Sequence, residues 1–216
     1  MTMSTIRFLF VAIVLATISA YPALSQEEGE MSFFITSAGA GDGANLGGIA
    51  GADRHCSMLA RAAGSDEKTW HAYLSTSGSE GVDARDRIGS GPWFNAEGIQ
   101  VAANVDELHY SNVGLTKSTQ LNEKGEIVNG RGDDPNQHDI LTGSQFDGTR
   151  FTDGMDHTCG DWTSSGQGSA QVGHHDRTGG GRVASSWNSA HGSSNCGQAD
   201  LQATGGNGYF YCFAID

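Results

Sequence analysis

The most constraining feature of this sequence is its last stretch, Tyr209–Ile215, which carries Cys212 in the middle. The run is short, apolar and rich in aromatic residues, and glycines precede it, so it predicts a buried β-strand rather than a helix. A strand at the end of a chain stays ordered only if something holds it. Cys212 is the residue placed to do so, because a disulfide would tie the strand to a distant part of the chain.

Residues 1–25 predict a secretion signal. Arg7 supplies the positive start, residues 8–20 form an apolar core, and residues 23–25 offer the small side chains of a cleavage site. The apolar core is too short to span a bilayer as a helix, and no later segment is apolar enough to do so. We therefore expect cleavage before Gln26 and a secreted or periplasmic protein, with an uncleaved N-terminal anchor as the alternative.

Charge restricts the partners of the mature chain. Without Arg7, 11 basic residues face 25 acidic ones, a formal charge of −14. Such a surface repels the phosphates of nucleic acids and anionic lipids, and leaves cations, neutral sugars and basic protein patches as compatible partners. After a short acidic lead-in at residues 26–30, residues 31–216 have the size of one domain. Its 32 glycines and three prolines predict many tight loops.

The cysteines predict covalent cross-links. In an exported chain an even number indicates disulfides, and four cysteines allow three pairings. A four-cysteine zinc site is the alternative, but no two of them lie at the CxxC spacing typical of such sites. We therefore expect two disulfides among Cys56, Cys159, Cys196 and Cys212.

Hydrophobic periodicity predicts few regular elements before the last strand. Residues 31–37 and 69–75 have the pattern of strands, and residues 51–63 that of a helix with Cys56 on its buried face. A short helical segment at residues 83–88 and a strand at residues 140–142 follow. We expect the rest of residues 78–208 to be mostly loop, including a Ser/Gly-rich stretch at residues 164–194. The fold class is α+β, as a single loop-rich domain.

Several strings carry a resemblance to a known family. In chain order they are Gly48–Cys56, Ala60–Gly64, Trp70–Ser75, Leu141–Ser144, Asp147–Arg150, Cys159–Trp162, Cys196 and the Cys212 strand. Together these motifs resemble the endostatin domain of collagens over residues 31–216. Arg85–Trp93 and Ser186–Ser189 are more similar to bacterial secreted proteins, leptospiral endostatin-like surface proteins among them.

The resemblance implies a C-type-lectin-like fold with nested disulfides, Cys56 with Cys212 and Cys159 with Cys196. It also implies a role in binding or adhesion, since the leptospiral proteins are described as binding host matrix and complement regulators. We therefore expect a secreted, non-enzymatic domain that recognises extracellular protein or matrix ligands. The arginine-rich face through which collagen endostatin binds heparin has no counterpart in so acidic a chain.

A calcium-assisted, carbohydrate-binding lectin is the alternative function. C-type lectins that bind sugar hold calcium with a Glu-Pro-Asn loop and a Trp-Asn-Asp strand, which residues 134–136 and 187–189 resemble. Calcium is thus the candidate cofactor, and its hard oxygen ligands would come from Asp133, Asp134, Asn136 and Asp139. Against this, Ser189 replaces a carboxylate, collagen endostatins do not bind sugar through calcium, and residues 134–136 also favour an ordinary turn.

The candidate ligand-contacting residues are Asp134, Asn136, Trp93, Trp187 and Asn188. An exposed tryptophan can stack on a sugar or a protein ligand, but the same side chain also fills cores. We place Trp70 and Trp162 in the core and leave both interpretations open for the other two tryptophans.

Histidines are a second group of candidate metal ligands, for zinc. Imidazole and carboxylate groups suit that ion, and they occur together at His174-His175-Asp176, with His138, His157 and His191 elsewhere. Adjacent residues of an extended segment point to opposite sides, so only one of His174 and His175 can face a given site. Collagen endostatin binds zinc with N-terminal histidines, which residues 26–32 lack. We therefore expect solvated loop histidines.

Catalysis is not predicted. The chain has no nucleophile elbow, no HExxH helix and no glycine-rich phosphate loop. Paired cysteines would leave no thiol nucleophile. A hydrolase is the remaining alternative, because active sites assembled from distant loops leave no local signature.

Overall fold

The computed structural model describes Met1, residues 29–179, Val183 and residues 185–216. The predicted signal, apart from Met1, and residues 26–28 lie outside the described residues. The elements are β1 (Phe33–Ile35), α1 (Gly48–Ala62), β2 (Trp70–Ala72), η1 (Ala84–Arg87), β3 (Trp93–Phe94), β4 (Gln100–Ala102), η2 (Glu107–Ser111), β5 (Asp139–Leu141), α2 (Cys159–Trp162), β6 (Gln171–His174), β7 (His191–Gly192), α3 (Gln198–Thr204) and β8 (Gly206–Ala214). Within the described residues, no helix has the length and hydropathy needed to span a membrane.

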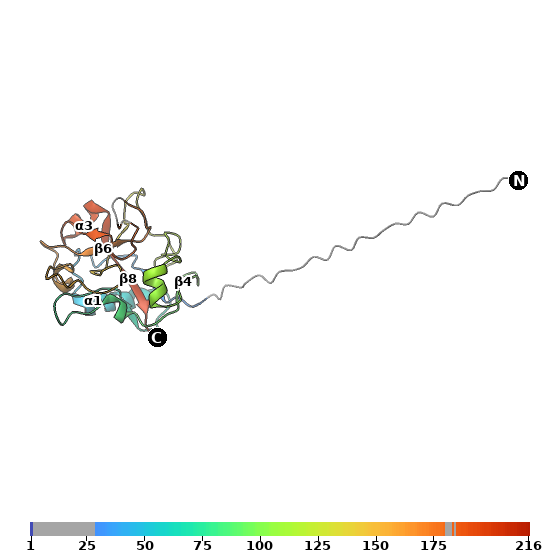
Figure 1. The fold of residues 1–216 in the computed structure, drawn as a ribbon, viewed down its shortest axis with the longest axis horizontal. Helices are drawn as coiled ribbons and strands as arrows, with labels where there is room; N and C mark the ends of the chain where they lie inside the picture. Colours follow the sequence, from blue (N-terminus) through green and yellow to red (C-terminus); the bar gives the residue numbers. More distant parts are fainter. Residues whose placement is uncertain (2–28, 180–182, 184) are drawn as a thin grey trace.

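The last strand is buried, as the sequence predicts, and it pairs with three other strands of the main sheet. In Figure 1, β8 passes through the middle of the molecule, between α3 and α1. The strand order is β1-β8-β5-β6-β7, and β2 also pairs with β8. Both β1 and β2 run antiparallel to the C-terminal half of β8, whereas β5 runs parallel to its N-terminal half. A separate two-stranded sheet joins β3 to β4.

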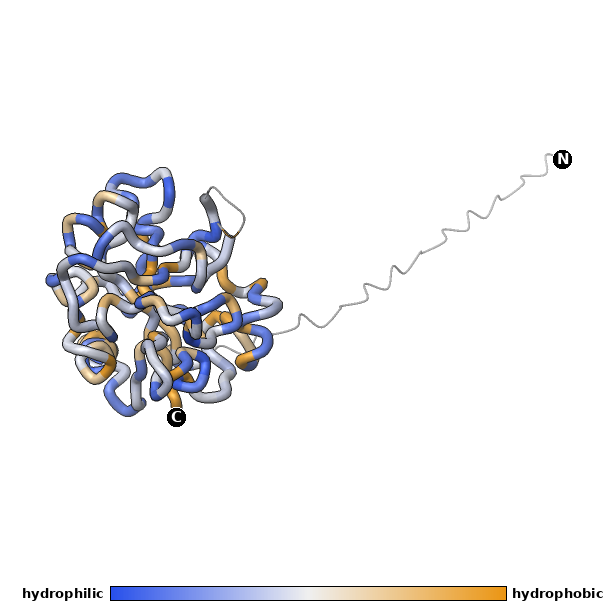
Figure 2. The backbone as a smooth tube through the Cα atoms, turned by 60° about the vertical axis from the view of Figure 1, so that its left-hand side comes forward, coloured by the Kyte–Doolittle hydropathy of each residue, from blue (hydrophilic) through white to orange (hydrophobic). Residues whose placement is uncertain are grey.

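Alternation along β8 divides the core into two halves. Successive side chains of a strand point to opposite faces. Phe210, Cys212 and Ala214 accordingly pack with α1 and both disulfides on one face. Tyr209, Tyr211 and Phe213 belong to an aromatic cluster on the other. Figure 2 shows the hydrophilic segments mainly in the outer loops, and hydrophobic colour close to the C-terminus.

Both disulfides have the nested pairing implied by the endostatin resemblance. Cys56 on α1 is joined to Cys212 on β8, and Cys159 is joined to Cys196. The described chain is therefore a loop-rich mixed α/β domain with two disulfides. Such cross-links persist in oxidising compartments outside the cytoplasm.

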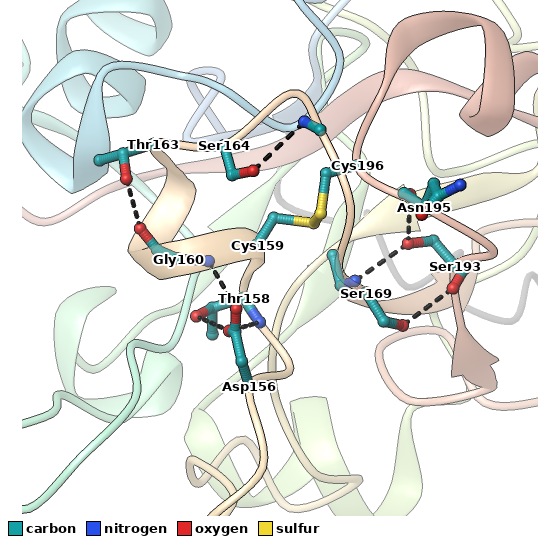
Figure 3. Close-up of a disulfide and its surroundings, with 12 residues drawn as sticks. Asp156, Thr158, Cys159, Gly160, Thr163, Ser164, Ser169, Ser193, Asn195 and Cys196 are labelled. Carbon is teal, nitrogen blue, oxygen red and sulfur yellow. Dashed lines mark hydrogen bonds between the residues drawn. A yellow bond between two sulfur atoms is a disulfide. The ribbon is translucent and has the colours of Figure 1, made fainter.

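The segment labelled α2 is a single left-handed turn beside the second disulfide (Figure 3). The φ angles of Cys159, Gly160, Asp161 and Trp162 are 50°, 65°, 52° and 67°. Only glycine adopts this region freely, so the three other residues are strained. The Asp156 carboxylate stabilises the turn by accepting a hydrogen bond of 2.7 Å from the backbone N–H of Gly160.

The remaining elements agree with the sequence to different degrees. The predicted helix at residues 51–63 begins three residues earlier, at Gly48, and the predicted helical segment at residues 83–88 is a short 3₁₀ helix at Ala84–Arg87. The prediction that residues 78–208 are mostly loop misses several elements in that range, namely β3, β4, β6, β7 and α3. Trp70 and Trp162 are buried, as predicted.

Candidate functional site

A cluster of three histidines and one aspartate lies at the end of the main sheet. Asp139 of β5 is paired in register with His174 of β6. Val172, two residues from His174, is paired with His191 of β7. Residues that are paired across strands, or two apart within one strand, share a face of the sheet. The register therefore directs the side chains of Asp139, His174 and His191 to one side.

His138 completes the cluster from the residue before β5. Its ring stacks on the His174 ring with a centroid separation of 4.1 Å and an interplanar angle of 14°. Gly205, at φ +103°, makes room for it, because a Cβ there would lie 3.1 Å from the Cδ2 atom of His138. The four residues are here named the His/Asp cluster: His138, Asp139, His174 and His191.

One oxygen is at the centre of the His/Asp cluster. Oδ1 of Asp139 lies 3.2 Å from Nε2 of His138, 3.3 Å from Nε2 of His174 and 3.5 Å from Nε2 of His191. The side chains of Asp139, His138 and His174 are 4, 7 and 3% exposed, whereas His191 is 44% exposed. Solvent therefore reaches the cluster from the His191 side.

The electrostatics of the cluster keep its central carboxylate ionised. Burial opposes ionisation, yet the pairing with His174 and His191 holds the pKa of Asp139 below its ordinary value. The same contact with Asp139 raises the pKa of His191 above its ordinary value. A charged carboxylate among imidazoles is an arrangement that can hold a divalent cation.

A second carboxylate lies behind His138. Oδ1 of Asp176 is 3.4 Å from Nδ1 of His138, and the Asp176 side chain is 2% exposed. Burial raises its pKa, but hydrogen bonds from His138 and from the backbone N–H groups of Arg131 and Thr178 bring the pKa of Asp176 well below its ordinary value. Asp176 is therefore an anion that fixes the orientation of the His138 ring.

The four predicted calcium ligands are not brought together as one site. The Asp133 carboxylate forms an ion pair with Lys117 and accepts a hydrogen bond of 2.7 Å from the backbone N–H of Gly130. Asp139 instead belongs to the His/Asp cluster. Among the described residues, the one group of three or more His, Cys, Asp or Glu ligand atoms within 4.8 Å of one another is His138, Asp139 and His174.

The other two predicted calcium ligands lie in the turn at the cis-Pro135 peptide bond. Asp134 is exposed, and the Asn136 side-chain oxygen accepts a hydrogen bond of 3.3 Å from the backbone N–H of His138. Asn136 thus helps to position a residue of the His/Asp cluster. Its oxygen is engaged within the turn, which agrees with the alternative interpretation of residues 134–136 as an ordinary turn.

Three of the predicted ligand-contacting residues are buried, which corrects that prediction. Trp93, Trp187 and Asn188 are each 1% exposed. The two tryptophans fill the aromatic half of the core, because Trp93 packs edge-on against Phe213 and Trp187 against Tyr211. The Asn188 amide donates hydrogen bonds to the Tyr73 hydroxyl and to the carbonyl oxygens of Gln145 and Phe146. None of the three buried side chains therefore reaches a ligand at the surface.

The prediction of solvated histidines is also wrong for most of the set. His138, His174 and His175 are buried, whereas His191 is exposed. The expected opposition of adjacent residues is confirmed, since His174 faces Asp139 and the Nε2 atom of His175 lies 3.0 Å from the carbonyl oxygen of Asn129. A strand prediction at residues 171–174 would have placed His174 opposite Asp139.

A second surface consists of exposed apolar side chains on two loops that meet at Arg85. Tyr110, in η2, is 59% exposed, and Val113, just after η2, is 74% exposed. Phe146, in the loop before Asp147, is 62% exposed. Arg85 donates a hydrogen bond of 3.0 Å to the carbonyl oxygen of Asp147. The adjacent Tyr110 hydroxyl raises the pKa of the Arg85 guanidinium. The set Arg85, Tyr110, Val113 and Phe146 is here named the aromatic loop surface.

Comparison with models of known protein families and with curated protein sequences finds no match to this chain. The two features of this chain that could contact a ligand or an ion are therefore the aromatic loop surface and the His/Asp cluster.

Proposed function

We propose that this protein is a secreted or periplasmic, endostatin-like domain of the C-type-lectin-like fold, which binds an extracellular protein or matrix ligand and catalyses no reaction. The nested disulfides support the fold assignment, since the endostatin resemblance implies the same pairing. Cross-linking of α1 to the central strand supports a binding role, because it keeps the loops in fixed positions before a ligand arrives.

The observation that carries the proposal is the aromatic loop surface. Exposed aromatic residues beside an arginine are typical of the energetic centre of protein interfaces. Tyr110 and Phe146 come from loops that are 36 residues apart in sequence and are joined through Arg85. Exposed apolar side chains of this size, on segments joined through one arginine, are anchors that a protein partner can bury.

Charge indicates which partner fits this surface. Asp106 lies 3.6 Å from Arg85, and its side chain is 81% exposed. Asp147 adjoins Phe146, and the whole chain has a formal charge of −13. A partner with a basic rim around an apolar centre would therefore be attracted at long range and complementary at contact. We propose a basic extracellular protein as the ligand.

Biosensor binding tests the proposal. The mature protein is passed over a panel of purified matrix proteins and complement regulators, alongside the variant Tyr110→Ala/Phe146→Ala. The matched control is Met58→Ala, which removes an apolar side chain of 57% exposure from α1. We expect the double variant to lose at least about tenfold in affinity, as truncation of central aromatic anchors does, and the control to bind normally. Equal binding by all three proteins would contradict the proposal.

The calcium-assisted lectin is the less favoured function. Lys117 already neutralises Asp133, and the carboxylate of Asp139 lies among imidazoles, whereas calcium prefers a shell of oxygen ligands. A glycan array with and without EDTA separates the two functions. Signal that EDTA abolishes, and that Asp134→Ala removes, would favour the lectin over the protein-binding domain.

A further inference from the structure

We propose that the His/Asp cluster is a zinc site in which His138, Asp139 and His174 are ligands and His191 supplies a fourth ligand at its solvent side. The site lies on the main sheet, whereas the aromatic loop surface lies on loops around Arg85. The inference is therefore independent of the proposed protein ligand.

The separations of the ligand atoms fit zinc. Ligand atoms bound about 2.05 Å from a zinc ion lie about 3.3 Å apart at the corners of a tetrahedron. The three distances from Oδ1 of Asp139 to the imidazole nitrogens are 3.2, 3.3 and 3.5 Å. Ligand atoms of His138, Asp139 and His174 also lie within 4.8 Å of one another. His191 lies outside this tight group and would reach the ion by rotation of its exposed side chain.

The central oxygen of the cluster, Oδ1 of Asp139, has room for a further bonding partner. Among the described residues, Oδ1 of Asp139 is buried and lies 3.2, 3.3 and 3.5 Å from three imidazole nitrogens, and none of these three contacts has the geometry of a full hydrogen bond. A buried oxygen without full hydrogen bonds destabilises the fold. A cation bound to Oδ1 and to the neighbouring nitrogen lone pairs would remove this destabilisation.

The number of N–H groups on the His138 ring also favours a cation next to Asp139. Its Nδ1 atom faces the Asp176 carboxylate and its Nε2 atom faces Asp139. A neutral imidazole has only one N–H, so it can donate to only one of the two carboxylates. If Nδ1–H donates to Asp176, the Nε2 lone pair and Oδ1 of Asp139 converge on the position of a cation. A carboxylate behind a ligating histidine is the usual outer shell of a zinc site.

The surroundings of His191 favour the tautomer that a ligand needs. Its Nδ1 atom lies 3.0 Å from the carbonyl oxygen of Gly192, to which an N–H can donate. The Nε2 atom then carries the lone pair and points toward Asp139. Three imidazoles and one carboxylate provide the nitrogen and oxygen ligands that zinc binds in tetrahedral sites, whereas calcium takes six to eight oxygens. Zinc is therefore the ion that this donor set selects.

Zinc titration of the mature protein, freed of metal by a chelator, tests the inference. We expect one ion per chain by calorimetry, and tetrahedral d–d absorption in the visible range when cobalt replaces zinc. Asp139→Asn and His174→Gln each remove a ligand and should lower the affinity by more than about 100-fold, beyond the 10–100-fold that outer-shell changes cost. Asp176→Asn should fall within that outer-shell range.

The control variants separate loss of zinc from loss of fold. His157→Ala removes a histidine that pairs with Asp153 outside the cluster, and it should bind zinc normally. His191→Ala changes an exposed side chain, so it should fold normally, and because it removes the fourth ligand it should also lower the zinc affinity by more than about 100-fold. Absence of zinc binding by the parent protein, or normal binding by both His191→Ala and Asp139→Asn, would overturn the proposal.

Discussion

At the scale of single residues, the aromatic half of the core depends on a buried polar chain. The Asn188 amide donates a hydrogen bond of 2.9 Å to the Tyr73 hydroxyl. That hydroxyl lies 2.8 Å from Nε2 of His109, and Nδ1 of His109 lies 2.7 Å from the carbonyl oxygen of Val105. Because Nδ1–H donates to Val105, Nε2 accepts from Tyr73, and the chain requires a neutral His109.

Because these hydrogen bonds require a neutral His109, we expect the protein to lose stability in mild acid. Burial lowers the pKa of His109 below its ordinary value of 6.5, so in this range the unfolded chain binds the proton more readily. The contribution of His109 to the free energy of unfolding is complete above pH 6.5 and falls as the pH drops below it, by up to about 1.4 kcal/mol per pH unit. Urea unfolding of the parent and of His109→Gln at several pH values should give a shallower dependence for the variant. Parallel curves would contradict this assignment.

At the scale of elements, Asp53 connects a helix to a strand and a 3₁₀ helix. Its Oδ1 atom accepts a hydrogen bond of 2.8 Å from the backbone N–H of Ala72 in β2 and one of 2.6 Å from Arg87 in η1. The position of α1 against the sheet therefore depends on this carboxylate as well as on the Cys56–Cys212 bridge.

Replacement of Asp53 should loosen this junction. We expect Asp53→Ala to lower the free energy of unfolding by about 2–3 kcal/mol, because it leaves the Ala72 N–H and the half-buried Arg87 without their acceptor. Urea denaturation measures the change, and Asp66→Ala, at an exposed acidic residue, is the matched control. A change for Asp53→Ala within about 0.5 kcal/mol of the control would refute the role.

The elements also show how much the sequence could predict. The aromatic run with Cys212 and the helical spacing around Cys56 were sufficient for β8 and α1, because their apolar periodicity is set by burial. The strands β6 and β7 were missed, since His174 and His191 lie in polar Ser/Gly-rich sequence and are ordered by pairing with distant residues. The His/Asp cluster follows from that pairing, so the sequence offered Asp139 as a calcium ligand and the histidines as zinc ligands but did not bring them together. Trp187 and Asn188 were offered as ligand-contacting residues but are buried, because a local motif does not determine whether its side chains face the core or the solvent.

At the scale of the whole molecule, two disulfides hold a glycine-rich chain in one shape. The bridge between Cys56 and Cys212 spans 156 residues, and that between Cys159 and Cys196 spans 37. Closing the longer loop restricts the unfolded chain more strongly, by about 5 kcal/mol against about 4 kcal/mol in the chain-entropy model. Loops such as those of the aromatic loop surface can then stay ordered with little regular structure of their own.

Removing each bridge should therefore have unequal effects. We expect Cys56→Ala/Cys212→Ala to destabilise the protein more than Cys159→Ala/Cys196→Ala does, in thermal unfolding followed by circular dichroism. The first pair joins α1 to the central strand, so its loss should also weaken the packing of the core around Phe210. A larger loss from the second pair would show that the local turn at Cys159–Trp162 governs stability instead.

Contact between the aromatic loop surface and the ligand can be observed by hydrogen–deuterium exchange of the protein, alone and bound to the strongest partner from the biosensor panel. We expect slower exchange on binding in peptides that cover residues 105–114 and 145–149, with α1 unchanged. Protection confined to other segments, with residues 105–114 and 145–149 exchanging as in the free protein, would contradict it.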